Sequence, residues 1–255
     1  MKPVYSETMI DFHTHILPGV DDGSKNLDES LQLLQMEQQQ GIDIVVLTPH
    51  YYSSQNSPEV FFRRRYQAWR LLCESWQRGM PRLLLGAEVE FFEGITALAN
   101  LQDFCIQRTS LLLLEMPFCS WSERIIRIVE ELNGTGGIQI VLAHVERYPY
   151  VTEEPTLLYN WVSSGAIAQI NSSGLIRGGH TAKLLNKYIQ WNLVHLLCSD
   201  AHNMHTRQPN LRQAHEALPE ASSLRFKQNG EAVFWGRPLI PEEPIQPRYR
   251  FGQWV

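Results

Sequence analysis

The chain has 255 residues, the length of one large domain or two small ones, and its 44% hydrophobic residues are enough to form a core. A net charge of −5 provides no basic field for nucleic acid, and no apolar run approaches the length of a membrane span. Four scattered cysteines without a CxxC pair argue against a disulfide framework and a zinc ribbon, and suit a reducing cytoplasm.

Residues 1–8 are too short and polar for a signal peptide, which favours a cytoplasmic protein. Beyond them, short apolar runs typical of buried strands alternate with patterns typical of helices. The predicted strands cover residues 8–12, 42–47, 82–87, 110–114, 138–143, 166–170 and 193–198. The predicted helices cover residues 26–40, 58–78, 93–100, 123–132, 155–164, 181–190, 209–217 and 220–228.

This alternation predicts an α/β fold with a parallel sheet, most simply closed into a barrel. The strands are almost continuously apolar, as expected when both faces of a sheet are covered. We therefore expect one barrel domain over residues 1–236, followed by an extended proline-rich tail over residues 237–255.

Ligand-type side chains follow the carboxyl ends of most predicted strands, which is where barrels of this kind form their active sites. His13 and His15 share a face because side chains alternate along a strand. A carboxylate that ends a buried strand, such as Glu115, is costly unless it is paired or bound to metal. Glu88 is preferred to Glu90 and Glu93 because it comes first after its strand. The candidate ligands are His13, His15, Asp22, His50, Glu88, Glu115, His144, Asp200 and His202.

Nine ligand-type side chains exceed the needs of one ion and predict two or three. Imidazole and carboxylate ligands without thiolate suit manganese, iron or zinc, and the sequence does not choose among them. The carboxylates would cancel only part of the charge of three divalent ions, which leaves a positive site that matches a phosphate dianion.

Two arginines lie near these ligands in the sequence: Arg147 follows His144 by three residues, and Arg207 follows His202 by five. Arginine binds phosphate oxygens bidentately. Metal ions with arginines predict in-line attack on phosphorus by a metal-activated hydroxide. A cysteine phosphatase is excluded, because no cysteine is followed by arginine six positions later. Several aromatic residues near the strand ends fit either a pocket for an aromatic leaving group or ordinary packing: Tyr51, Tyr52, Phe91, Phe92, Phe118, Trp121 and Tyr148.

The ordered motifs resemble the PHP (polymerase and histidinol phosphatase) superfamily. More narrowly, they resemble the bacterial manganese-dependent tyrosine-protein phosphatases of capsular and exopolysaccharide loci. Asp-Asp-Gly after His-x-His, and His-x-x-Arg-Tyr, favour this branch over histidinol phosphatase. The resemblance covers about residues 10–211 and rests on the segments 11–23, 48–50, 86–88, 115, 143–148, 169–171 and 199–202.

The resemblance implies a distorted (β/α)₇ TIM-like barrel of the PHP type with a trinuclear metal site. It implies that His13, His15, Glu88 and Asp200 hold one ion. Glu88 would bridge to a second ion, and the remaining ligands divide between the second (Glu115, His144) and the third (Asp22, His50, His202). Arg147 and Arg207 would grip the phosphate. The implied partner is the phosphotyrosine tail of a tyrosine autokinase that controls polysaccharide synthesis.

One segment departs from the family pattern: residues 175–180, Leu-Ile-Arg-Gly-Gly-His, replace the small apolar-glycine segment expected there. This difference bears on substrate fit and assembly more than on chemistry. Two alternatives stay open, a small-molecule phosphomonoesterase similar to histidinol-phosphate phosphatase and a binding module with structural metal. The sequence also leaves open the metal, a homo-oligomeric state, the particular kinase, and the roles of His180, His205 and the tail.

Overall fold

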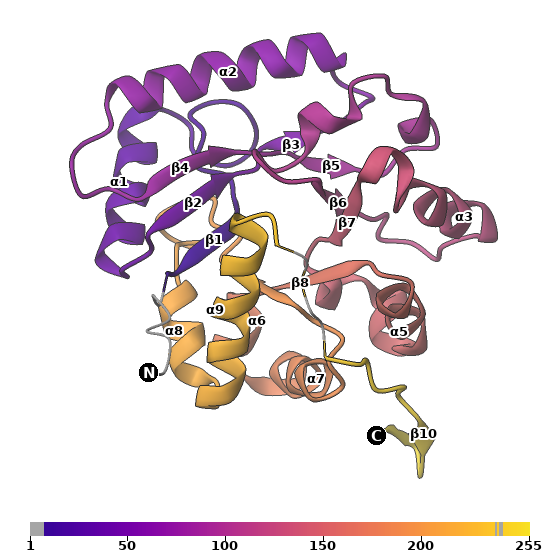
Figure 1. The fold of residues 1–255 in the computed structure, drawn as a ribbon. Coiled ribbons are helices and arrows are strands. Elements are labelled where there is room, and N and C mark those ends of the chain that lie inside the picture. Colours follow the sequence, from indigo (N-terminus) through magenta and orange to yellow (C-terminus); the bar gives the residue numbers. More distant parts are fainter. Residues whose placement is uncertain (1–7, 238, 240–241) are drawn as a thin grey trace.

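A computed structural model describes residues 8–237, 239 and 242–255, and Figure 1 shows strands curling around an interior with helices outside. The principal helices and strands alternate along the chain. The strands are β1 (Ile10–Thr14), β2 (Ile44–Leu47), β3 (His50–Tyr51), β4 (Arg82–Leu85), β5 (Glu88–Glu90), β6 (Leu111–Glu115), β7 (Gln139–Leu142), β8 (Ile167–Asn171), β9 (Leu196–Cys198), β10 (Tyr249–Arg250) and β11 (Gln253–Trp254). The α-helices are α1 (Leu27–Gln39), α2 (Pro58–Glu74), α3 (Glu123–Leu132), α4 (Pro149–Glu153), α5 (Thr156–Ser163), α6 (Ser172–Ile176), α7 (Gly179–Gln190), α8 (Leu211–Ala217) and α9 (Glu220–Phe234).

The strands from β1 to β9 are parallel and follow one another around a barrel. One sheet has the order β1-β2-β4 and the next has the order β3-β5-β6-β7-β8-β9. Short interruptions at residues 48–49 and 86–87 divide two strand paths into β2 with β3 and β4 with β5. A bridge between Thr14 and Ala201 brings the last strand path back to the first. The predicted distorted barrel is confirmed.

The barrel interior is apolar at one end and polar at the other. Inward positions alternate along each strand, as in Ile10 and Phe12 of β1 or Leu111 and Leu113 of β6, and they form one buried cluster. The same alternation continues to Glu115 at the end of β6. Glu115 therefore reaches the carboxyl end of the barrel because it occupies the last inward position of its strand.

Helix α9 covers the apolar end of the barrel and is longer than the predicted helix 220–228. It continues through Gly230, where a side chain's first carbon would lie 3.2 Å from the Phe12 ring. Glycine is unfavourable within a helix by about 1 kcal/mol. Here it lets α9 approach β1 closely, and tertiary packing outweighs the local preference.

Other predicted boundaries differ more. The helix expected over residues 93–100 is only one 3₁₀ turn, Ile95–Ala97, and a second turn, Leu101–Phe104, lies just beyond it. Helices α4 and α6 and the short strands β3 and β5 were not predicted. These elements are only two to five residues long, too short to show a periodic pattern. In the part of the chain that the structure describes, no helix is both long and apolar enough to cross a bilayer.

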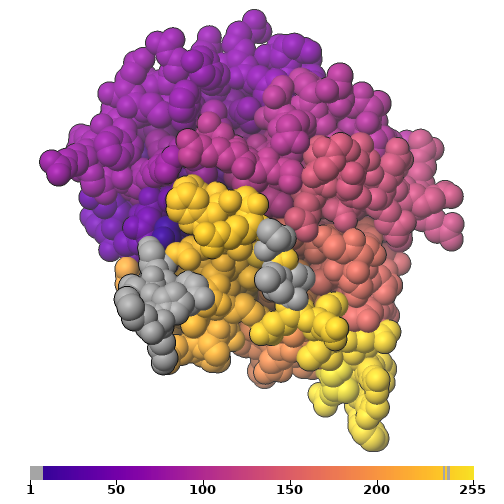
Figure 2. Space-filling view, in the orientation of Figure 1, coloured from indigo at the N-terminus to yellow at the C-terminus, as the bar shows by residue number. Residues whose placement is uncertain are grey.

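The segment predicted as a tail lies on the outside of the barrel. Its residues 238 and 240–241 are outside the described part of the chain. The described end forms a hairpin of β10 and β11, which protrudes at one edge of the molecule (Figures 1 and 2). Trp254 Nε1 donates to the Glu153 carbonyl, which ties the hairpin to the end of α4.

Candidate metal centre and phosphate site

His13 and His15 bring their Nε2 atoms together at the end of β1, 3.1 Å apart. Glu88 Oε2 lies 3.1 Å from each of these nitrogens, and Asp200 Oδ1 lies 3.5 Å from each. Ligand atoms about 2.0–2.2 Å from a shared tetrahedral ion would be about 3.3–3.6 Å apart. The four side chains therefore have the spacing of ligands around a single cation.

Glu88 also faces a second group through its other oxygen. Glu88 Oε1 lies 2.9 Å from His144 Nε2, and that nitrogen is 3.4 Å from Glu115 Oε1. One carboxylate thus contacts two sets of ligand atoms, as a bridging ligand would.

A third group forms around the exposed carboxylate of Asp22. Its Oδ1 lies 3.6 Å from His50 Nε2 and 3.5 Å from His202 Nε2. The His50 ring also turns its Nδ1 toward Glu88 Oε2, at 3.1 Å. The ligand atoms of His15 lie close enough to join this third set. The nine predicted ligands are therefore all brought together, but His15 and His50 each face two groups.

Several buried ligand atoms lie within ion-pair distance of one another, yet they make no contact of hydrogen-bond geometry with the described residues. They include Glu88 Oε2, Asp200 Oδ1, His50 Nδ1 and His202 Nε2. A buried polar atom without a partner is costly, and native structures rarely leave one unexplained. Divalent cations would satisfy these atoms together, so the residues present fit a metal centre.

The electrostatics of the cluster also suit cations. Burial acts to raise the pKa of Glu88, but the histidines around it hold that pKa well below its usual value. Burial acts to lower the pKa of His144, yet hydrogen bonds to Glu115 and Glu88 raise it to about 9. The pKa of His15 is likewise raised, against the effect of burial, by Asp21 and Glu88. Without metal, the protons on His15 and His144 thus balance ionised carboxylates. Metal binding would replace those protons, because ligands bind in their deprotonated forms.

Asp21 orients the histidines from behind. Its Oδ2 accepts a hydrogen bond from His15 Nδ1 at 2.7 Å and another from the backbone N–H of His50 at 2.9 Å. The first bond fixes the imidazole tautomer so that His15 Nε2 faces the cluster as an acceptor. The Pro-Gly turn lies between the two histidines and the two aspartates in the sequence. It turns the backbone so that Asp21 and Asp22 come back to the histidines in space.

Gln169 and Asn171 of β8 connect candidate ligands from three different strands through hydrogen bonds. Gln169 Oε1 accepts from His13 Nδ1 at 3.1 Å and from the His144 N–H at 2.8 Å. Its amide donates to Asn171 Oδ1, and Asn171 donates to Asp200 Oδ2 at 2.7 Å. In the sequence, these hydrogen bonds are indicated only by two amide side chains at alternate positions of an otherwise apolar strand.

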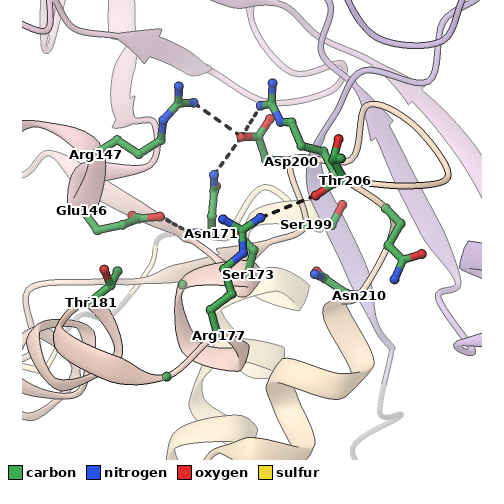
Figure 3. Close-up of a pocket in the computed structure, with 14 residues that line it drawn as sticks. Glu146, Arg147, Asn171, Ser173, Arg177, Thr181, Ser199, Asp200, Thr206 and Asn210 are labelled. Carbon is green, nitrogen blue, oxygen red and sulfur yellow. Dashed lines mark hydrogen bonds and ion pairs between the residues drawn. The ribbon is translucent and has the colours of Figure 1, made fainter.

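Arg147 and Arg207 both lie beside Asp200, and Figure 3 shows Arg147 next to that carboxylate. Arg207 Nη2 donates to Asp200 Oδ2 at 2.7 Å, and Arg147 Nη1 lies 3.7 Å from the same oxygen. Both side chains remain partly exposed to solvent, Arg147 to 42% and Arg207 to 33%. They can therefore contact an anion that enters from solvent above the metal ligands.

Some of the aromatic residues near the strand ends lie beside the ligand cluster, and others pack in the core. The Tyr52 ring stacks on His50 with centroids 4.9 Å apart, and the Phe118 ring lies parallel to His144 at 6.1 Å. Phe118 also carries the Arg147 guanidinium over its face. Tyr51 and Trp121 instead pack in the hydrophobic core. Only Tyr52 and Phe118 of these four stand beside the cluster.

A cavity of about 410 Å³ opens beside Asp200, between α6, the start of α7 and the loop before α8 (Figure 3). Its walls include Arg147 and Arg207. A second cavity, of about 310 Å³, lies on the other side of the cluster against Asp22 and Tyr52. The candidate ligands Asp200 and Asp22 thus border two different open spaces, both large enough for side chains.

Two known proteins are similar to this chain over nearly its whole length. The chain is 30% identical over 256 residues to the tyrosine-protein phosphatase YwqE of Bacillus subtilis, covering 96% of this chain and 99% of YwqE. It is 31% identical over 255 residues to the putative tyrosine-protein phosphatase CapC of Staphylococcus aureus, covering 96% and 98%.

A solved structure shares the fold over nearly the whole chain. It comes from work on YwqE of Bacillus subtilis and CpsB of Streptococcus pneumoniae, described as metal-dependent tyrosine phosphatases. The TM-score is 0.83 at 26% identity, and the match covers 94% of this chain and 100% of that one. A phosphotriesterase homology protein from Escherichia coli, at 11% identity and a TM-score of 0.53, is similar in fold alone.

The family match is equally extensive. Residues 9–228 match the family described as "Capsular polysaccharide synthesis, CpsB/CapC". This span contains the nine candidate ligands and both arginines, and it agrees with the resemblance drawn from the motifs. The chain therefore belongs to the CpsB/CapC family of capsular polysaccharide synthesis.

Proposed function

We propose that the chain is a metal-dependent protein-tyrosine phosphatase, a phosphoric monoester hydrolase. The observation that carries this proposal is the cluster of buried ligand atoms that lack hydrogen-bond geometry to the described residues, with two partly exposed arginines at its mouth. Relatives over nearly the full chain carry the name tyrosine-protein phosphatase, which supports the same activity.

Two to three divalent ions would be held by the nine clustered side chains, and we propose manganese, with iron or zinc as alternatives. Histidine and carboxylate ligands suit all three metals. Bound ions would lower the pKa of a water molecule and screen the charge that develops on a phosphoryl group. The protein's own contribution is to position the substrate against this centre.

Arg147 and Arg207 would bind the phosphate oxygens and orient the ester for in-line displacement. Both guanidinium groups already converge on Asp200, so an anion bound by them lies directly beside the ligands. Phe118 supports Arg147 from below and offers an aromatic face at the entrance. A tyrosyl leaving group would lie against this face.

The physiological substrate we propose is phosphotyrosine on a bacterial tyrosine autokinase that regulates capsular or exopolysaccharide synthesis, and the reaction would take place in the cytoplasm. Two features support a polypeptide substrate. The ligands lie between two solvent-open cavities, and the arginines are accessible from outside.

Replacing Arg147 by alanine tests the proposal. We expect the variant to keep its metals and to lose about a hundredfold or more in kcat/KM on an aryl phosphate, because a phosphate contact made in the transition state is removed. Elemental analysis beside steady-state kinetics separates the two effects. Arg147→Lys, which keeps the charge without the planar fork, should recover part of the activity.

Substrate comparison on the wild-type protein separates the rival functions. We expect a phosphotyrosyl peptide to be hydrolysed with a higher kcat/KM than histidinol phosphate. The reverse preference would favour a small-molecule phosphomonoesterase. Metal-loaded protein that turns over no phosphoester at all would favour a structural role for the metal.

A further inference from the structure

The cavity beside Asp200 contains a third arginine that the proposed catalytic arrangement does not use. Arg177 follows α6, and Figure 3 shows its side chain in the space below Arg147, with its guanidinium near Thr206. Side chains on the same walls, Ser173 and Thr181, add hydroxyl groups. The cavity is thus polar, about 410 Å³ in volume, and directly continuous with the two phosphate-binding arginines.

Arg177 differs from its two neighbours in its pairing. Arg147 and Arg207 both approach the Asp200 carboxylate, whereas Arg177 Nη2 makes one long hydrogen bond, 3.5 Å, to the Thr206 carbonyl. No carboxylate of the described residues lies within ion-pair distance of Arg177. Its guanidinium therefore has donors available for an incoming acceptor.

The backbone next to Arg177 keeps this space open. Gly178 and Gly179 have φ values of +71° and +73°, which glycine adopts without strain. A side chain's first carbon at either position would meet no atom within 4 Å. This Arg-Gly-Gly turn is the segment that departs from the pattern expected of the family, so it is a place where this chain can differ from relatives in what it binds.

The position of the cavity limits what can enter it. With phosphate against Arg147 and Arg207, the residues beside the phosphotyrosine must pass over the cavities that flank the ligands. Asp22 borders one cavity and Arg207 the other, and their side chains are 4.0 Å apart. The Asp22 side therefore presents a carboxylate, and the Arg177 side presents an unpaired cation. Glu146 also lines the Arg177 side: its Oε1 accepts the Asn171 N–H at 2.9 Å, and its Oε2 is buried and makes no hydrogen bond to a described residue.

We propose that the cavity is a second substrate subsite, in which Arg177 binds the carboxylate of an acidic residue near the phosphotyrosine. The inference rests on the proposed phosphatase function and adds a sequence preference to it. Arg177 is then a specificity-determining residue, and Ser173 and Thr181 are hydrogen-bond donors to the same carboxylate.

Kinetics on a set of phosphotyrosyl peptides test the subsite. The full-length, manganese-loaded protein is assayed on an alanine-flanked peptide, and then on peptides with single aspartates at each flanking position. We expect kcat/KM to rise about three- to tenfold at one or more positions, mainly through a lower KM, as one partly exposed charge-assisted contact would give. The preference should shrink as salt is added.

Variants of Arg177, including one with reversed charge, provide a stricter test than the wild-type protein alone. Arg177→Ala should bring the aspartate-to-alanine ratio close to one, and Arg177→Glu should favour lysine at the same positions. Arg78→Glu makes the same charge change in the connection between α2 and β4 and should leave the wild-type preference in place. A gained lysine preference cannot arise from partial unfolding.

Three results are decisive. An equal aspartate preference in wild-type and Arg177→Ala would overturn the subsite, and so would a wild-type preference for lysine, which would point to Glu146 instead. Absence of turnover on p-nitrophenyl phosphate by the metal-loaded wild-type protein would overturn the proposed function itself. The two proposals therefore fail in different assays.

Discussion

Asp200 joins the other candidate metal ligands to the arginines. Its Oδ1 faces His13 and His15 at 3.5 Å, while Oδ2 accepts hydrogen bonds from Asn171 and Arg207. Opposing charges overcome the effect of burial and lower the pKa of this carboxyl group. The side chain is therefore ionised over the whole range in which the protein would work.

Asp200→Asn tests this double role with little change in shape. We expect the variant to bind less metal and to lose at least about a hundredfold in turnover of an aryl phosphate, because an anionic ligand becomes neutral. Metal content by elemental analysis and kcat are the measurements. His215→Gln, a change to a half-buried histidine hydrogen-bonded to Ser223, is the matched control and should leave both unchanged.

His195 lies in the connection into β9, away from the cluster, and gives a prediction about pH. It is 4% exposed, and its Nδ1 accepts a hydrogen bond from the Ala168 N–H. Burial, with a contribution from Arg225, lowers the pKa of His195 to about 4. The unfolded chain therefore binds more protons than the native chain between about pH 6.5 and 4.

Stability should consequently fall as the pH is lowered through this window. For His195 alone the loss approaches about 3 kcal/mol near pH 4, since each pKa unit is worth about 1.4 kcal/mol. His195→Asn keeps an acceptor for the Ala168 N–H and removes the titration. Urea unfolding at pH 7 and pH 4.5 should show a smaller acid-induced loss in the variant; equal losses would contradict the assignment.

The loop between β1 and α1 is the element that returns Asp21 and Asp22 to the histidines. It folds back so closely that Ser24 N–H donates to the His15 carbonyl at 2.9 Å. Gly23 packs against the same carbonyl, and a methyl group there would overlap the His15 backbone and Cβ. The glycine is therefore required for close approach, and its φ is not in the left-handed region.

Gly23→Ala should displace this loop and separate Asp22 from His50 and His202. We expect a loss of stability of about 1–3 kcal/mol from overpacking, lower metal content and at least tenfold lower activity. Gly94→Ala is a suitable control, because its new methyl would be 3.6 Å from the Phe92 ring, an ordinary contact. Retained metal stoichiometry in Gly23→Ala would show that Asp22 does not depend on this packing.

Element prediction succeeded where patterns are long and failed where they are short. The helix predicted over residues 123–132 is α3 with the same ends, because an amphipathic stripe lies between a Ser122 cap and Asn133. Each of the seven apolar runs predicted as a strand overlaps one of the strands from β1 to β9. The break between β2 and β3 at residues 48–49 was not visible, since it reflects how His50 pairs with Glu88 across the sheet.

At the scale of the whole molecule, the described part of the C-terminal segment contacts the outside of the barrel at several separate points, among them Asn192 and Arg225. Ile245 N–H donates to the Trp191 carbonyl, Trp254 donates to the Glu153 carbonyl, and Lys187 contacts the Trp254 carbonyl. None of the pocket-lining residues of the candidate site belongs to this segment. We propose that the barrel functions without it.

Truncation after Glu243 tests this division. We expect the melting temperature to fall by about 3–8 °C, as a loss of about 1–2 kcal/mol gives in a protein of this size. Metal content and kcat/KM on an aryl phosphate should stay at wild-type values. Trp254→Phe, which removes one hydrogen bond, should give only a fraction of the shift. Loss of metal on truncation would instead make the tail part of the functional domain.

The sequence by itself determined which residues could form the site. Parallel strands alternate inward and outward side chains, and their carboxyl ends meet at one rim, so polar residues that end apolar runs are brought together by any closed arrangement. His13, Glu115 and Asp200 were identifiable on this basis. The family motifs reinforced the same positions.

Tertiary structure alone decided how these residues share their contacts. His13 meets Gln169 across 156 positions of sequence, and His50 turns different nitrogens toward Glu88 and Asp22. His144 and Asp200 adopt left-handed φ values of 32° and 55°, which cost energy that the surrounding packing must offset. Such details depend on distances between strands, and a one-dimensional pattern contains no such distances. For the same reason, only the tertiary structure shows that Arg177 shares a cavity with Asp200 and makes no ion pair with a described residue.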